Sequence, residues 1–155
     1  MQEFVLKNSI KTVGVKDEDG NLVCTLKIDS ADGSILDRFF GCIERLENLK
    51  QEANATIDGL KGREDTGENE TLIEACKVNI GFLNKVVSEI DGLFGPDTVR
   101  NVYRANYELN PYFVPDEIML IDFLEGIMPV MESIYGERMK EKQRRFNVNR
   151  KGGKR

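Results

Sequence analysis

Hydrophobic residues near the start of the chain recur at every second position. Within the segment 22–28, one face of an extended chain is formed by Leu22, Cys24, Leu26 and Ile28. Thr25 and Lys27 point to the other face, and this period of two is typical of a half-buried β-strand. A β-branched run at 10–15 precedes it, and the polar stretch between the two includes Gly20 and Asn21, which tolerate the positive φ angles of tight turns. The pattern predicts a β-hairpin.

From Ser34 onward the hydrophobic period changes from two to 3.6, which is the period of an amphipathic helix. Apolar residues then recur at steps of three and four, and this predicts helices over 34–60, 69–94, 97–106 and 116–146. Gly95-Pro96 separates the second helix from the third, because proline disfavours a helical residue before it. Ser34 is expected to cap the first helix.

The order of elements predicts the fold class and the domain organisation. Strands come first and helices follow, so we expect an α+β, mostly helical fold: an N-terminal β-hairpin, a bundle of about four helices and a long C-terminal helix. A single domain is predicted over 1–146, with a hairpin region at 1–30 and a helical region at 34–146. An isolated hairpin is marginally stable, so it needs support from helices, from a third strand at Glu3–Leu6 or from another chain.

Charge is distributed unevenly along the chain. Residues 1–136 carry 13 Lys/Arg and 25 Asp/Glu, a formal charge of −12, whereas residues 137–155 carry 9 Lys/Arg and 2 acids, a formal charge of +7. We predict that residues 147–155 form a basic disordered tail. The basic candidates for a partner contact are Arg144, Arg145, Arg150, Lys151, Lys154 and Arg155. Weak contact with nucleic acid and a simple solvated helix end are alternative interpretations of this segment.

Residues that carry enzyme chemistry are scarce. The chain has no His and no Trp, and its three cysteines (Cys24, Cys42 and Cys76) fall at apolar positions. We interpret them as small hydrophobic residues in a reducing compartment. Asp17-Glu18-Asp19-Gly20 lacks most ligands of a calcium loop, and no metal, cofactor or catalytic residues are predicted. We therefore expect a non-enzymatic protein. The segment 1–9 lacks the pattern of a signal peptide, so the expected location is the cytoplasm.

Two groups of side chains are candidates for contact with a protein partner. Four aromatic residues lie within eleven positions: Tyr103, Tyr107, Tyr112 and Phe113. Tyrosine is enriched at interfaces because one end of its side chain is apolar and the other is polar. The last predicted helix carries three flexible methionines that suit promiscuous contacts: Met119, Met128 and Met131. The alternative for both groups is an ordinary place in the helical core.

Several segments together resemble a known family. A strand-turn-strand start is followed by amphipathic helices, and Asp91-Gly92-Leu93-Phe94-Gly95 closes one of them. The last helix runs from Phe123-Leu124-Glu125-Gly126-Ile127-Met128 through Tyr135 to a Lys/Arg-rich end. From about Gly20 to Arg155 the chain resembles the tail assembly chaperones of long-tailed bacteriophages and prophages, especially the small kind found in phages of Gram-positive hosts.

This resemblance implies a function without a catalytic site. Such proteins bind the tape measure protein, keep its hydrophobic helices soluble and deliver it to tail tube subunits in the bacterial cytoplasm, and they are absent from the finished virion. Many self-associate, and a frameshift near the end of the gene often yields a longer form that contacts the tube protein. The expected partners are therefore the tape measure protein, the tail tube protein and further copies of the chain, with no membrane partner. The alternative is a small adaptor or regulatory protein with weak nucleic-acid contact through the basic tail.

Overall fold

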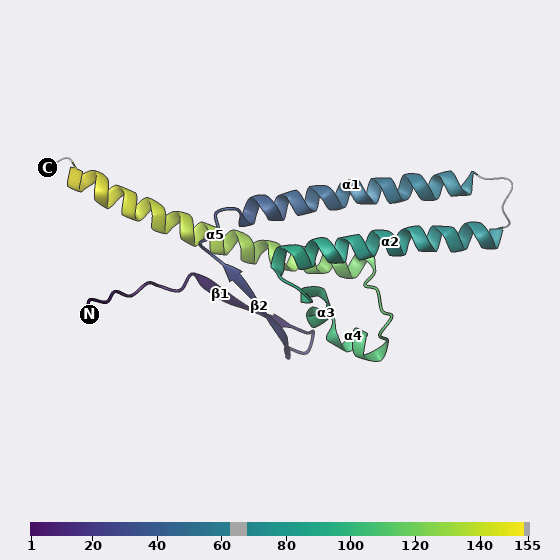
Figure 1. The fold of residues 1–155 in the computed structure, drawn as a ribbon, viewed down its shortest axis with the longest axis horizontal. Coiled ribbons are helices and arrows are strands. Elements are labelled where there is room, and N and C mark those ends of the chain that lie inside the picture. Colours follow the sequence, from purple (N-terminus) through teal and green to yellow (C-terminus); the bar gives the residue numbers. More distant parts are fainter. Residues whose placement is uncertain (63–67, 154–155) are drawn as a thin grey trace.

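The computed structural model describes residues 1–62 and 68–153 and has the predicted α+β, mostly helical architecture (Figure 1). The element order is β1 (Ile10–Lys16), β2 (Leu22–Asp29), α1 (Ile35–Lys61), α2 (Glu68–Phe94), α3 (Thr98–Val102), α4 (Arg104–Leu109) and α5 (Glu117–Gly153). α1 and α2 form a long antiparallel pair, and α5 runs beside only the part of α2 nearest the hairpin (Figure 1). The N-terminal segment and the end of α5 both extend away from the α1–α2 pair, towards the same side of the molecule.

The β-hairpin is confirmed, with one correction to its register. β1 and β2 pair antiparallel, and Leu26 and Ile28 are buried as the period of two predicts. Val15 pairs with Cys24 but Lys16 pairs with Leu22, so a bulge inserts one extra residue into β2. Because the bulge reverses the alternation, Leu22 is 61% exposed and does not share the buried face. Of the possible supports for the hairpin, packing against helices is the one that the structure shows, on α2 and α3, and residues 3–6 do not add a third strand.

The hairpin turn uses an aspartate as a local acceptor. Asp17 Oδ1 accepts hydrogen bonds from the backbone N–H groups of Asp19 at 3.0 Å and Asn21 at 2.9 Å. Gly20 has a φ of 82°, the left-handed conformation that glycine adopts without steric cost. The acidic turn is therefore ordered by its own backbone.

The connection between α2 and α5 differs from the single short helix predicted over 97–106. Two short helices, α3 and α4, occupy this region, because Tyr103 (φ −106°, ψ 35°) leaves the helical conformation between them. Asp91 Oδ1 accepts the backbone N–H of Val99 at 3.0 Å and satisfies one free donor in the first turn of α3. The predicted cap at Ser34 is also wrong in its detail, since its side chain bonds Asp32 and makes no cap bond to α1.

The last helix is longer than its hydrophobic stripe. We predicted a helix to about Phe146 and a disordered tail over 147–155, but α5 continues to Gly153. Arg144 and Arg145 bind Glu141 one turn earlier, and Gly152 is the first strong helix-breaking residue after Phe146. Lys154 and Arg155 lie outside the described residues.

The hydrophobic core lies where the β-hairpin, α1, α2, α3 and α5 meet. Its centre includes Phe39 and Ile90, each 0% exposed, and Val99, which is 1% exposed. Phe39 packs edge-on against Phe94 with ring centroids 6.3 Å apart, and Phe94 packs in the same way against Phe123 at 5.7 Å. This aromatic row joins α1, α2 and α5 through rings that prefer edge-to-face contact.

Candidate functional site

The hydrophobic stripe of α2 is covered along only part of its length. Near the hairpin, Leu83, Val86 and Ile90 are at most 5% exposed. Towards the start of the helix the same stripe is open to solvent, with Leu72 64% exposed and Ile80 45% exposed. We call this exposed part the distal apolar face, and its residues are Leu72, Ile73, Cys76 and Ile80.

The start of α5 explains why this face is open. Glu117, the first residue of α5, forms an ion pair with Lys50 of α1, with Nζ and Oε1 2.9 Å apart. Beyond this point α1 and α2 continue as a two-helix pair without a third helix beside them (Figure 1). Ala53 and Leu60 of α1 remain buried, so α1 and α2 still pack against each other there. α5 covers the apolar stripe of α2 near the hairpin, but it does not reach the distal apolar face.

A small apolar cleft marks the inner end of this face. Its volume is about 160 Å³, and it opens where α1, α2 and α5 converge. The apolar lining residues are Ile43, Leu46, Phe82, Leu83, Val86, Leu120, Ile121 and Leu124. Glu47, Lys50 and Glu117 are the charged residues that line it. An apolar furrow bordered by charged side chains is the arrangement that receives an amphipathic helix in helix-in-groove recognition.

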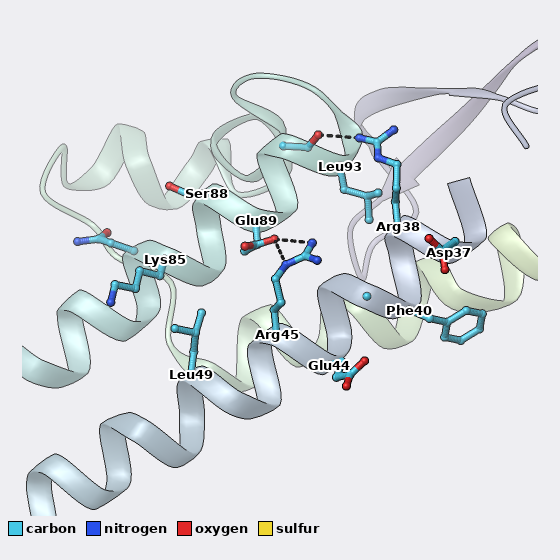
Figure 2. Close-up of a pocket in the computed structure, with 13 residues that line it drawn as sticks. Asp37, Arg38, Phe40, Glu44, Arg45, Leu49, Lys85, Ser88, Glu89 and Leu93 are labelled. Atoms are coloured by element: carbon cyan, nitrogen blue, oxygen red, sulfur yellow. Dashed lines mark hydrogen bonds and ion pairs between the residues drawn. The ribbon is translucent and has the colours of Figure 1, made fainter. Parts of the chain in front are cut away.

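A larger cleft between α1 and α2 is lined by more charged and polar residues than apolar ones (Figure 2). Its volume is about 1,030 Å³, and Figure 2 shows its two arginines bound to oxygens of α2. Arg45 binds Glu89 at 2.9 Å and Arg38 donates to the carbonyl oxygen of Gly92 at 3.1 Å. The hydrogen bond that Arg45 donates to the Glu89 carboxylate raises the pKa of Arg45 and stabilises its charged form. These arginines therefore connect the two helices across the cleft.

A third cleft lies between the β-hairpin and α5, and it contains two of the predicted partner residues. Its volume is about 780 Å³. Val13, Val15 and Leu26 line one side, and the lining on the helical side includes Tyr103 and Met119. The Tyr103 hydroxyl donates a hydrogen bond to the carbonyl oxygen of Met119, so this tyrosine fastens the α3–α4 junction to α5. Its polar end already has a partner within the chain.

The environment of Tyr103 changes its ionisation. Burial, with a smaller contribution from the nearby carboxylates of Asp122 and Asp116, raises the pKa of Tyr103 to about 12. An unfolded chain loses the tyrosine proton near pH 10. The stability that the neutral phenol contributes is therefore complete below about pH 10 and is lost as the pH rises towards 12.

Tyr103→Phe should lower the free energy of unfolding by about 1 kcal/mol at neutral pH, because it removes a partly buried hydrogen bond. It should also make the loss of stability between about pH 10 and 12 less steep. Urea unfolding measured across this pH range tests both effects. If the free energy of unfolding fell equally steeply with pH for the wild type and for Tyr103→Phe, the raised pKa of Tyr103 would be contradicted.

The four predicted aromatic residues do not form one surface. The Tyr107 and Phe113 rings pack edge-on at 5.1 Å, and the Arg100 guanidinium lies 4.6 Å from the centre of the Tyr107 ring. Both rings are half-buried and stabilise α4 against the loop that follows it. Tyr112, in contrast, is 88% exposed. Of the four, Tyr112 is therefore the residue most available to a partner.

The three predicted methionines are also divided between the core and the surface. Met131 is 2% exposed and belongs to the core, so we remove it from the candidate surface. Met128 is half-buried and packs against the same core. Met119 is half-buried in the cleft beside the hairpin. The period of 3.6 placed these residues on the apolar stripe of α5 without showing which of them the hairpin and α2 would cover.

The basic end of α5 is partly paired within the helix. Arg144 and Arg145 both bind Glu141, each with a shortest distance of 2.9 Å. These two hydrogen bonds lower the pKa of Glu141 to about 2, so its carboxylate stays charged. Arg150 and Lys151 lie on the described backbone of α5, whereas Lys154 and Arg155 fall outside the described residues. Sequence reasoning missed Lys7 and Lys11, which line a cleft together with this end of α5.

Comparisons with protein-family models, with curated proteins and with solved structures found no match. Within residues 1–62 and 68–153, no three His, Cys, Asp or Glu side chains come together to hold a metal ion. None of the helices in the described part of the chain is long and apolar enough to cross a membrane.

Proposed function

We propose that this chain is a non-enzymatic tail assembly chaperone of a long-tailed phage or prophage. In this proposal it binds the tape measure protein, keeps that protein soluble in the bacterial cytoplasm, assists assembly of the tail tube and is absent from the mature virion. The proposal rests on the apolar stripe of α2, which is buried near the hairpin and exposed towards the start of the helix. A chaperone for amphipathic helices needs an accessible apolar surface beside helices of its own, and the distal apolar face has that character.

The position of α5 indicates how the client would bind. α5 buries its own apolar residues against the inner part of the α1–α2 pair, and these include Leu120, Phe123 and Ile127. A client helix placed along the distal apolar face would continue this packing beyond Glu117. The apolar cleft beside Ile121 would receive its end nearest α5. The net negative charge of residues 1–136 opposes aggregation of the loaded complex.

The distal apolar face can be tested by co-expressing the chain with a tape measure protein. We expect the wild-type chain to keep the client in the soluble fraction and to co-purify with it. Leu72→Asp combined with Ile80→Asp should weaken binding by at least ~30-fold and return the client to the pellet, because hot-spot residues contribute about 2 kcal/mol or more. Both side chains are exposed, so the variant itself should remain folded.

A matched control adds the same two charges to another face of α2. Asn84 and Ser88 are exposed, follow one another by one helical turn and line the cleft between α1 and α2, outside the distal apolar face. Asn84→Asp combined with Ser88→Asp should leave client solubility unchanged. A client that stays insoluble and unbound with the wild-type chain would refute the proposed function. Equal losses with both double variants would refute the assignment of the binding face.

A further inference from the structure

A cleft between the N-terminal segment and α5 gathers positive charge from distant parts of the sequence. Its volume is about 710 Å³, within the range of roughly 300–1,000 Å³ that is common for ligand pockets. We call it the basic cleft, and its six cationic residues are Lys7, Lys11, Arg138, Lys142, Arg144 and Arg145. Lys7 and Lys11 belong to the acidic part of the chain, so the tertiary structure enlarges the basic region beyond the end of α5.

The acids in this cleft leave an excess of positive charge. Glu137 and Glu141 also line it, and Glu141 is bound by Arg144 and Arg145. Lys7, Lys11 and Lys142 are exposed, and none of them takes part in an ion pair within the described residues. A concave surface of one charge sign concentrates ligands of the opposite sign. The cleft is therefore suited to a ligand with several negative charges.

The lining of the cleft also includes apolar side chains. Leu6 is 79% exposed and Val5 is 94% exposed, and both line the cleft opposite Ile134 of α5. The main chain of residues 2–7 forms no hydrogen bond with any described residue, so its N–H and C=O groups are open to an added strand. Phosphate groups gain nothing from an apolar lining. An alternating acidic and apolar peptide would use the cations, the apolar residues and the free backbone together.

We propose that the basic cleft binds an extended, acidic segment of a partner protein in which acidic and apolar residues alternate. Carboxylates of the segment would pair with Lys7, Lys11 and Lys142, and its apolar side chains would pack on Leu6. Its backbone would pair with the N-terminal segment by strand addition. This inference does not depend on the proposed chaperone function, because it concerns a surface at the opposite end of α5 from the distal apolar face.

Fluorescence anisotropy with a labelled synthetic peptide tests this site on the full chain. The probe is a peptide of about ten residues in which Glu alternates with Val, long enough to span residues 5–11 in an extended form. We expect salt-sensitive binding that Lys7→Glu combined with Lys142→Glu weakens by about tenfold or more. Leu6→Ser should weaken it by about threefold, because it removes apolar contact.

Controls separate this site from general charge effects. Lys27→Glu combined with Lys77→Glu makes the same charge change on β2 and α2, and it should alter binding less than about twofold. A peptide with Gln in place of Glu should lose most of its binding, and single-stranded DNA of equal charge should bind more weakly than the Glu–Val peptide. The proposal is overturned if the peptide does not bind at low salt, if both double variants weaken binding equally, or if DNA binds as tightly. None of these results affects the client test on the distal apolar face.

Discussion

Phe39→Ala should lower the free energy of unfolding by about 3–5 kcal/mol, the usual cost of removing a buried phenylalanine ring. Phe39 is 0% exposed and stands in the row of rings that joins α1 to α2 and α5. Its removal leaves a cavity beside Phe94 and takes away an edge-to-face contact. Urea or thermal unfolding monitored by circular dichroism measures the loss.

The neighbouring position on α1 supplies a control for Phe39. Phe40 is 50% exposed and packs edge-on against Phe39 at 5.8 Å. Phe40→Ala should cost only about 1 kcal/mol, because half of its surface is already in water. Similar losses for the two variants would mean that the core is not organised around Phe39.

Ile90→Ala and Ile80→Ala should differ greatly in their effect on stability, although both residues lie on one stripe of one helix. Ile90 is 0% exposed, so its truncation should cost about 2–5 kcal/mol through lost burial and a new cavity. Ile80 is 45% exposed, and its truncation should change stability by no more than about 0.5 kcal/mol. Denaturant unfolding of the two variants at one protein concentration measures the difference.

The comparison tests the arrangement of α5 directly. Helix propensity and residue type are the same at both positions, so only the covering by other elements distinguishes them. A large loss for Ile80→Ala would show that the distal apolar face is covered in solution. That result would remove the surface on which the proposed client contact depends.

Local patterns were sufficient for most of the fold. The period of two between Leu22 and Ile28 and the Gly20 turn predicted the hairpin. The period of 3.6 predicted the bounds of α1 and α2 and the start of α5 to within one residue, whereas α5 ends seven residues later than predicted. Two of the errors have causes outside the local sequence. The bulge at Val15 and Lys16 depends on how two strands pair, and the break at Tyr103 accompanies a hydrogen bond from its side chain to α5, which lies outside the segment itself.

The candidate surfaces were less predictable, because exposure depends on distant elements. The aromatic and methionine groups were placed on apolar faces, but the sequence does not say that Met131 is covered and Tyr112 is exposed. Lys7 and Lys11 gave no signal in the sequence, since neither belongs to a basic run. Only the path of the N-terminal segment places them in a cleft with Arg138 and Lys142.

The sequence by itself determined which face of each element is apolar, because side-chain direction follows directly from the periods of strand and helix. It also determined the acidic character of residues 1–136 and the basic character of the C-terminal segment. Only the tertiary structure decided how much of the α2 stripe is buried. That depends on where α5 begins relative to Lys50, which is a long-range contact that no periodicity along a single helix contains.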